Sequence, residues 1–160
     1  MELSTERTGV VLRSMSEADA GAFHQLLQNS ATHLSRFPDY RESVEKDIGH
    51  WVDELSKSRP DLDFAIWEDG TLVGRIALNP VDPPKFGCGY LLAETACGRG
   101  LATLSLSALV THAFNHLHAT DVYAGVTHRN GASVAVLERV GFSRVASFEE
   151  YDRFHLASGL

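Results

Sequence analysis

A short loop with two glycines constrains the possible folds of this chain more than any other feature. Gly98 and Gly100 lie in GYLLAETACGRGLA, residues 89–102, between a run typical of a strand and a long run with helical spacing. Glycine allows positive φ angles and a close approach of the backbone to a ligand. The first turn of a helix also presents unpaired N–H groups and about half a positive charge. With Arg99 between the glycines, the loop is typical of a site for a pyrophosphate group.

The residues around these glycines exclude two common phosphate-binding loops. A Walker loop continues with a glycine, a lysine and a serine or threonine, and this sequence does not follow here. A dinucleotide-binding loop has a third glycine and an early strand–helix–strand unit, and both are missing. Because two glycines are also common at a helix start without a ligand, the loop by itself leaves a purely structural role open.

The rest of the pattern predicts a mixed sheet with helices on its faces. Ser16 and Asp19 have the spacing of a capping box, and Asp69 with Gly70 forms a hairpin turn. Residues 79–85 contain three prolines and are expected to form a surface loop. Strands are expected over residues 9–13, 63–68, 71–78, 86–92, 122–127 and 143–150, with a short one near 154–157. Helices are expected from Ser16, over 41–57, after 102 and over 131–140. The helix over 41–57 would have an apolar face of Val44, Ile48, Trp51, Val52 and Leu55.

Composition narrows the function classes. The length of 160 residues suits a single domain over residues 1–160. No apolar run reaches the length of a membrane span and no signal-peptide core is present, so we expect a cytoplasmic protein that does not bind membranes. The formal charge of −7 argues against nucleic acid as a partner and fits cationic or neutral substrates. Cys88 and Cys97 match neither a metal-binding pattern nor a disulfide framework.

A second segment, HRNGASVAVLERVGF at residues 128–142, places polar side chains between a strand and a helix. Asn130 and Ser133 stand at the predicted helix start, where they either satisfy helix amides or contact a ligand. Gly141 and Phe142 end the helix and begin the next strand. Each of these features alone has a structural explanation.

In this order, the two segments resemble the GNAT superfamily of acetyltransferases, and within it the RimJ/RimL type. The shared motifs are the glycine loop CGRGLAT and the later N-x-x-S before Gly-Phe, and the resemblance spans about residues 9–150. It implies an α/β (α+β) fold with a mixed, mostly antiparallel central sheet and helices on both faces. Two splayed parallel strands, one ending at Leu92 and one at 122–127, would form the cleft for acetyl-CoA, the acyl-donor cosubstrate.

The resemblance also implies which residues hold acetyl-CoA. The backbone at Leu91 and Leu92 would bind the pantetheine arm and stabilise the oxyanion, and Asn130 would contact the pantetheine. The pyrophosphate would be held by the amides of Cys97, Gly98, Arg99, Gly100, Leu101, Ala102 and Thr103.

Two positions depart from the family pattern. Cys97 stands where the family usually has arginine or glutamine, so one side-chain contact to acetyl-CoA is lost and weaker affinity is expected. Leu137 stands where many members have a tyrosine that protonates the leaving thiolate. In the RimL-like branch the serine of N-x-x-S is proposed to do this, and here that serine is Ser133.

The expected reaction transfers an acetyl group to a primary amine, foremost the N-terminal α-amine of a protein or peptide. In RimL-like proteins a carboxylate after the Gly-Phe pair is the proposed base, which leaves Glu149, Glu150 and Asp152 as candidates. The alternatives are an enzyme that acetylates a small antibiotic or metabolite amine, and a non-catalytic acyl-CoA-binding regulatory module. A longer donor such as succinyl-CoA would involve Arg36, Arg41 or Arg75. Both a monomer and a homodimer are compatible with the sequence.

The acceptor region and the histidines carry weaker signals. Residues 32–40 and Trp51 hold aromatics that either line an acceptor pocket or belong to the core. His112 and His116 are four residues apart on the long helix, but no third ligand is evident, so no metal site is expected. We expect both histidines to be solvated or to cap the helix.

Overall fold

The computed structural model describes residues 1–159 and contains one eight-stranded sheet in the order β1-β2-β3-β4-β5-β6-β8-β7. Neighbouring strands are antiparallel except β5 and β6, which pair in parallel. The strands are β1 (Glu2–Ser4), β2 (Val10–Ser14), β3 (Asp63–Glu68), β4 (Thr71–Asp82), β5 (Lys85–Leu92), β6 (Asp121–Thr127), β7 (Ser143–Ser147) and β8 (Tyr151–Ala157). The helices are α1 (Ala20–Asn29), α2 (Ala31–Leu34), α3 (Pro38–Glu45), α4 (Ile48–Ser56), α5 (Leu101–His116) and α6 (Gly131–Val140), with 3₁₀ turns at Glu17–Asp19 and Glu94–Ala96. This is the expected mixed sheet.

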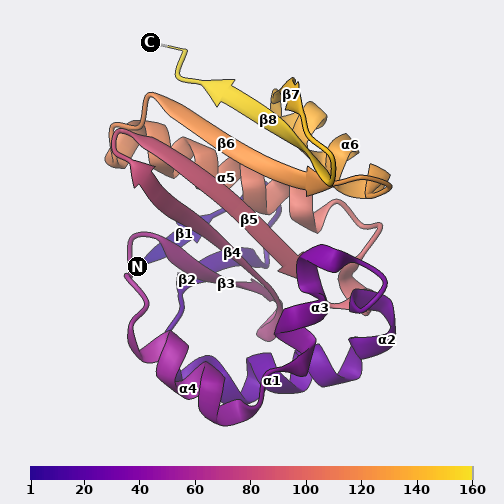
Figure 1. The fold of residues 1–160 in the computed structure, drawn as a ribbon. Coiled ribbons are helices and arrows are strands. Elements are labelled where there is room, and N and C mark those ends of the chain that lie inside the picture. Colours follow the sequence, from indigo (N-terminus) through magenta and orange to yellow (C-terminus); the bar gives the residue numbers. More distant parts are fainter. Residues whose placement is uncertain (160) are drawn as a thin grey trace.

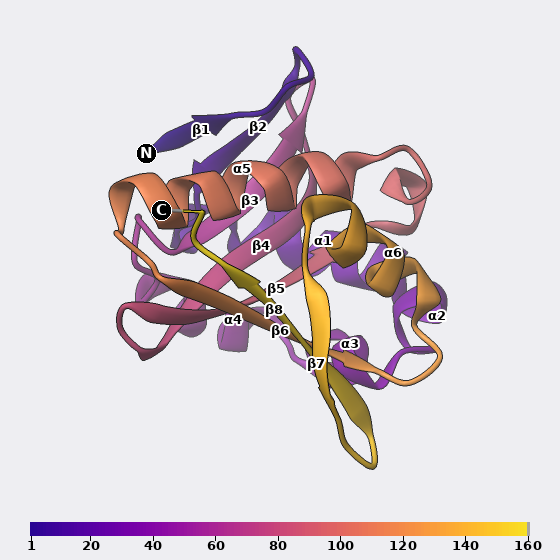
Figure 2. The ribbon, with the colours of Figure 1, turned by 90° about the horizontal axis from the view of Figure 1, so that it is seen from above.

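Helices cover both faces of the sheet, as the sequence predicts (Figure 1). The early helices α1 to α4 lie on one face, and the long α5 and the shorter α6 lie on the other (Figure 2). Alternate residues of a strand point to opposite faces, so Phe64 and Ile66 join the core under α5, while Ala65 joins the core under α1 and α4. The sheet therefore separates two apolar layers.

The predicted helix over residues 41–57 is wrong as a single element, because the chain forms α3 and α4 there. Lys46 has an extended backbone, with φ −77° and ψ 141°. The Asp47 carboxylate then accepts a hydrogen bond from the His50 amide at 2.8 Å and caps the start of α4. Two residues of the predicted apolar face are also exposed, since Ile48 and Val52 are 48% and 41% exposed. The capping box at Ser16 is confirmed, with its amide donating to the Asp19 carboxylate at 3.0 Å.

The proline-rich residues 79–85 are exposed as expected, but they extend a hairpin instead of forming a separate loop. β4 continues to Asp82 and β5 begins at Lys85. Pro80 lacks an N–H to donate, which would break a ladder in the middle of a sheet. Because β3 pairs with β4 only as far as Ala77, Pro80 has no neighbour on that side and costs no hydrogen bond.

The C-terminal strands also differ from the prediction. β7 ends at Ser147 rather than at residue 150, and the short strand expected near 154–157 begins at Tyr151. β8 lies between β6 and β7, where Phe154 is buried and both edges are paired. Figure 2 shows the turn between β7 and β8 projecting beyond the sheet.

Two further predictions concern membranes and histidines. Within residues 1–159, none of the helices combines the length and apolar character needed to cross a bilayer. His112 is only 3% exposed and its Nε2 lies 2.9 Å from the carbonyl oxygen of Asp61, so a solvated or capping role is wrong for this residue. Its ring stacks on His116, which is exposed, and the described residues contain no cluster of metal-ligating side chains.

Candidate functional site

The centre of the site is the point where β5 and β6 diverge. Their parallel register covers only Lys85 with Asp121, Phe86 with Val122 and Gly87 with Tyr123, although both strands continue beyond these pairs. The later residues of β5 therefore have no strand partner on the side of β6. This confirms the two splayed parallel strands expected from the sequence.

The alternation along β5 defines which backbone groups face this gap. The Ala93 amide donates to the Val73 carbonyl at 2.8 Å, toward β4. Because backbone groups alternate sides along a strand, those of Leu91 also point toward β4, while those of Tyr90 and Leu92 point toward β6. Leu91 and Leu92 are predicted to bind the pantetheine arm through their backbone, and of these two only Leu92 offers its amide to the gap. The backbone of Tyr90, which is not expected from the sequence, also faces it.

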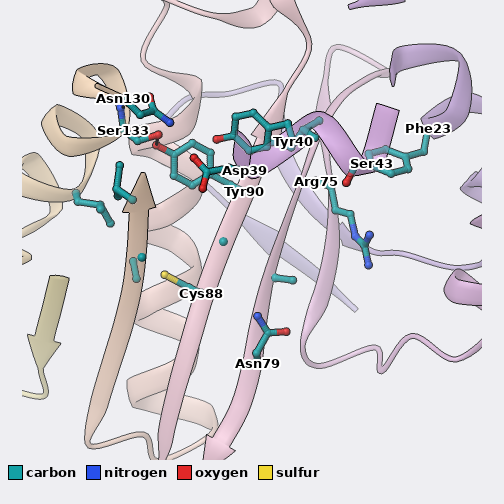
Figure 3. A pocket seen from close by; sticks show the side chains of 17 residues that line it. Phe23, Asp39, Tyr40, Ser43, Arg75, Asn79, Cys88, Tyr90, Asn130 and Ser133 are labelled. Carbon is teal, nitrogen blue, oxygen red and sulfur yellow. Dashed lines mark hydrogen bonds between the residues drawn. The ribbon is translucent and has the colours of Figure 1, made fainter. Parts of the chain in front are cut away.

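A cavity of about 390 Å³ occupies the gap. β4, β5 and β6 form its floor, and α1, α3 and α6 contribute the rest of its wall (Figure 3). Its polar lining residues are Asp39, Tyr40, Ser43, Arg75, Asn79, Cys88, Tyr90, Asn130 and Ser133. The cavity therefore joins the predicted cofactor residues of α6 to a segment of the predicted acceptor region.

Asn130 and Ser133 lie together at one end of this cavity. Asn130 is the N-cap of α6, and its side-chain oxygen accepts from the Ser133 amide at 3.4 Å. Both residues are buried, at 5% and 8% exposed. The helix-capping role left open by the sequence is therefore real for Asn130, and both side chains still face the cavity (Figure 3).

Two tyrosines complete this end of the cavity. The Tyr90 hydroxyl donates to Ser133 Oγ at 3.0 Å. Burial raises the pKa of Tyr90, and burial also raises the pKa of Tyr40 against the opposing effect of hydrogen bonding by Ser133 and Asn130. Both phenols therefore stay protonated at neutral pH and remain hydrogen-bond donors. In the sequence, only the position of Tyr90 within the β5 motif GYLL indicates a role at the site. Strand alternation puts its side chain on the opposite face from that of Leu91.

The glycine loop has the geometry that the sequence predicts. Gly98 and Gly100 have φ angles of 74° and 78°, in the left-handed region, and α5 begins directly after them at Leu101. Space for a side chain is open at Gly98. The amides at the start of α5 suit an anion such as a pyrophosphate, so the loop fits the pyrophosphate of acetyl-CoA.

The side chains of the loop do less than its backbone. Arg99 forms a two-pronged ion pair with Glu68, at 2.7 and 2.9 Å, so its charge is already matched. Arg7 donates to the Arg99 carbonyl at 2.9 Å and holds this peptide unit from the other side. Leu101 and Ala102 are buried in the core, which leaves only their backbone for a ligand. The Thr103 side chain lines a separate groove between α5 and the N-terminal strand.

Both cysteines have raised pKa values, which disfavour the nucleophilic thiolate. Burial raises the pKa of Cys97, with a smaller contribution from the charge of Glu94. Cys97 Sγ lies 3.6 Å from His33 Nε2. Burial raises the pKa of Cys88 to about 12. Because the thiolate is the reactive form, these shifts lower the reactive fraction of both thiols at neutral pH.

The three carboxylates proposed as bases lie outside the residues that line the cavity. Glu149 and Glu150 are exposed in the turn between β7 and β8. Asp152 accepts from Ser147 Oγ at 2.6 Å and from Arg144 at 3.4 Å. Hydrogen bonding from Ser147, followed by that from Arg144, lowers its pKa.

The charged residues that line the cavity are Asp39 and Arg75. Arg75 forms a two-pronged ion pair with Asp63, at 2.9 and 2.7 Å, and its guanidinium lies 5.7 Å from the ring centre of Phe23. Trp51 is buried beside it and belongs to the core, not to the cavity wall. Of the predicted acceptor segment, residues 32–40, Asp39 and Tyr40 reach the cavity, and Arg36 and Arg41, named for a longer acyl donor, are not among the residues that line it.

Comparisons with known proteins agree with this geometry. The family described as the acetyltransferase (GNAT) domain matches residues 10–143. YdaF of Bacillus subtilis (strain 168), provisionally named a ribosomal N-acetyltransferase, is 26% identical over 145 residues, covering 83% of this chain and 77% of YdaF.

Solved structures show the same fold. A RimL ribosomal L7/L12 α-N-protein acetyltransferase in complex with coenzyme A has a TM-score of 0.87 at 19% identity and covers 98% of both chains. Mycobacterium smegmatis RimJ with a CoA disulfide has a TM-score of 0.85 at 22% identity, covering 99% of this chain and 88% of RimJ. The match over residues 10–143, together with the cleft between β5 and β6, shows that the chain belongs to the GNAT acetyltransferase family, whose acyl donor is acetyl-CoA.

Proposed function

We propose that this protein transfers the acetyl group of acetyl-CoA to the N-terminal α-amine of a protein or peptide. The observation that carries the proposal is one continuous cavity that contains both the diverging edge of β5 and the Ser133 hydroxyl. Acetyl transfer needs a place for the thioester beside a proton donor, and these two features supply it. The name of the relative YdaF, which refers to ribosomal N-acetylation, supports a protein substrate and a cytoplasmic location.

The chain would bind acetyl-CoA mainly through its backbone. The amides of residues 97–103 would hold the pyrophosphate at the start of α5. The backbone groups of Tyr90 and Leu92 that face the gap would pair with the pantetheine arm like an added strand. Leu91 would pack against the acyl end, and Asn130 would contact the arm from α6. The Arg99–Glu68 pair would keep the loop in shape without contacting the phosphates.

The reaction needs one proton to leave the amine and one to reach the sulfur. The neutral amine nitrogen attacks the thioester carbonyl, a C–N bond forms, the C–S bond breaks, and the nitrogen releases one proton to water. The Leu92 amide would stabilise the oxyanion. Ser133 would donate its proton to the leaving thiolate and regain one from water, while the Tyr90 hydroxyl that donates to its oxygen stabilises the transient alkoxide. A leucine at position 137 leaves this role to Ser133.

An α-amine suits this cavity better than a lysine side chain. A peptide α-amine has a pKa of about 7.7–8.0, whereas lysine is near 10.4. The α-amine therefore loses its proton to water at neutral pH with little assistance. Because Glu149, Glu150 and Asp152 lie outside the cavity lining, a base-independent route of this kind is favoured. A longer acidic donor is disfavoured, since Arg75 is already paired with Asp63.

We infer that residues 1–160 act as one N-acetyltransferase domain, because the sheet from β1 to β7 is continuous through the described residues. The substrate is tested by mass spectrometry after incubation with acetyl-CoA. The panel contains peptides with free N-termini, N-terminally blocked peptides with lysine, and amine antibiotics. Acetylation of free N-termini alone supports the proposal. Acetylation of the small amines alone would assign the protein to metabolite or resistance chemistry, and coenzyme A binding without any acetylation would indicate a regulatory module.

A further inference from the structure

Asp39 is a carboxylate in the cavity wall that lacks a positively charged partner. It lies in the first turn of α3, directly before Tyr40, and lines the cavity. One of its oxygens, Oδ2, accepts from Thr127 Oγ1 at 2.7 Å. Within residues 1–159, none of the ion pairs includes Asp39. Its Oδ1 is therefore available to a ligand in the cavity.

The charge of the cavity wall depends on this residue. The other charged lining residue, Arg75, is neutralised by Asp63 through two hydrogen bonds. The wall thus presents one unmatched negative charge, that of Asp39. A negative charge in the wall of a cavity favours a cationic ligand over a neutral or acidic one.

The position of Asp39 relates this charge to the reacting end of the cavity. Thr127 is the last residue of β6, and the hydrogen bond from its hydroxyl to Asp39 connects this strand to α3. Figure 3 shows Asp39, Tyr40, Tyr90 and Ser133 among the side chains that line the cavity. Burial raises the pKa of Tyr40, and hydrogen bonding by Ser133 and Asn130 opposes this shift. The carboxylate and the proposed proton donor therefore face the same space.

We propose that Asp39 binds the protonated amine of the acceptor and orients its nitrogen toward the thioester. This role rests on the proposed function, because it requires that the acceptor is an amine. The amine arrives as the ammonium form, is held by Oδ1, and loses its proton to water before attack. Thr127 positions the carboxylate, and the aromatic ring of Tyr40 covers the apolar part of the acceptor.

This proposal gives the acceptor-binding role to a carboxylate from the early helices. Asp152 is engaged by Ser147 and Arg144, and Glu149 and Glu150 lie in the exposed turn. Asp39 is the only one of these four carboxylates among the residues that line the cavity. Its recognition needs the three-dimensional contact between α3 and β6, residues 39 and 127, which the sequence does not reveal.

The test compares Asp39→Asn with Glu42→Gln, a carboxylate on the same helix that pairs with Lys46 on the surface. Asparagine keeps the shape and can still accept from Thr127, but it removes the charge. We expect Asp39→Asn to raise the KM for the accepted peptide by about tenfold to a hundredfold, as for a lost hydrogen bond to a charged group. The affinity for coenzyme A should stay unchanged by calorimetry. Glu42→Gln should behave as wild type in both measurements.

A second readout measures binding without turnover. A copy of the accepted peptide with a dimethylated N-terminus keeps its positive charge but forms no stable amide, so it acts as a competitive inhibitor. Asp39→Asn should weaken this inhibition by the same factor as it raises the KM. Inhibition by the N-acetylated peptide, which is neutral, should not change. A variant that merely disturbs α3 would weaken both inhibitors.

The outcomes separate this inference from the proposed function. Wild-type protein that acetylates no amine overturns the proposed function and the role of Asp39 with it. Acetylation by the wild type with an unchanged KM in Asp39→Asn overturns the role of Asp39 alone. A rise in KM in Asp152→Asn, without one in Asp39→Asn, would overturn the role of Asp39 and assign acceptor binding to Asp152, which the sequence predicts only as a candidate base.

Discussion

The Tyr90 hydroxyl donates a hydrogen bond to Ser133 Oγ at 3.0 Å and so connects β5 to the start of α6 across the cleft. Because burial raises the pKa of Tyr90, the phenol remains a donor at neutral pH. Ser133 then has its own proton free to give to a ligand. Both residues line the cavity.

Ser133→Ala removes the proposed proton donor and should lower kcat by about a hundredfold or more, the usual contribution of general acid catalysis. The affinity for acetyl-CoA should change little, because Asn130 and the loop amides remain. Tyr90→Phe removes only the supporting donor and should lower kcat by about tenfold. Steady-state kinetics and calorimetry check both variants. Equal turnover in Ser133→Ala and wild type would exclude Ser133 from the reaction.

The phosphate loop depends on a backbone conformation that only glycine adopts easily. Gly100 has a φ of 78°, where a side chain costs about 1–2 kcal/mol and shifts the amides at the start of α5. We expect Gly100→Val to weaken coenzyme A binding by at least about tenfold while the circular dichroism spectrum stays native. Gly21→Ala is the matched control, since Gly21 lies in α1 with open space around it. Unchanged affinity in Gly100→Val would contradict the assignment of the loop.

The sequence predicts the fold well where local patterns are sufficient. The glycine loop, the long helix and the cap at Asn130 depend on residues close together in the chain, and each forms as predicted. The same local reasoning fails between α3 and α4. The helical spacing of apolar residues runs through Lys46, and only the competing cap at Asp47 ends the helix.

The candidate site is only partly visible in the sequence, because half of it comes from distant segments. The residues of the loop and of α6 follow from their motifs. Asp39 and Tyr90 reach the cavity through contacts with Thr127 and Ser133, which are 88 and 43 residues away in the chain. The paired charges are also hidden, since the matching of Arg99 by Glu68 depends on how β3 packs against the loop.

The packing of α4 predicts different roles for two apolar positions one turn apart. Leu55 is 1% exposed and packs in the core under α4, whereas Val52 is 41% exposed. Leu55→Ala should lower the free energy of unfolding by about 2–5 kcal/mol through the cavity it leaves. Val52→Ala should change it by no more than about 0.5 kcal/mol. Urea denaturation of the two variants measures this, and similar losses would mean that Val52 is packed as tightly as Leu55.

The hydrogen bond from Ser147 to Asp152 predicts how the C-terminal hairpin responds to acid. Because the folded-state pKa of Asp152 is lowered, its charged form stabilises the fold at pH values above the unfolded-state pKa, which is about 3.9. This stabilisation is lost as the pH falls through the lower folded-state pKa. Wild type should therefore lose stability between about pH 5 and pH 3 more steeply than Asp152→Asn, which has no charge to lose there.

Ser147→Ala separates the hydrogen bond from the charge itself. Removing the Ser147 hydroxyl, the largest cause of the lowered pKa, should bring the pKa of Asp152 closer to its ordinary value. The acid-dependent loss of stability should then be smaller, while the carboxylate stays in place. Urea denaturation of wild type, Ser147→Ala and Asp152→Asn at about pH 3, 4, 5 and 7 provides the comparison. A Ser147→Ala profile parallel to that of wild type would mean that Arg144 and His128, not Ser147, hold the Asp152 charge.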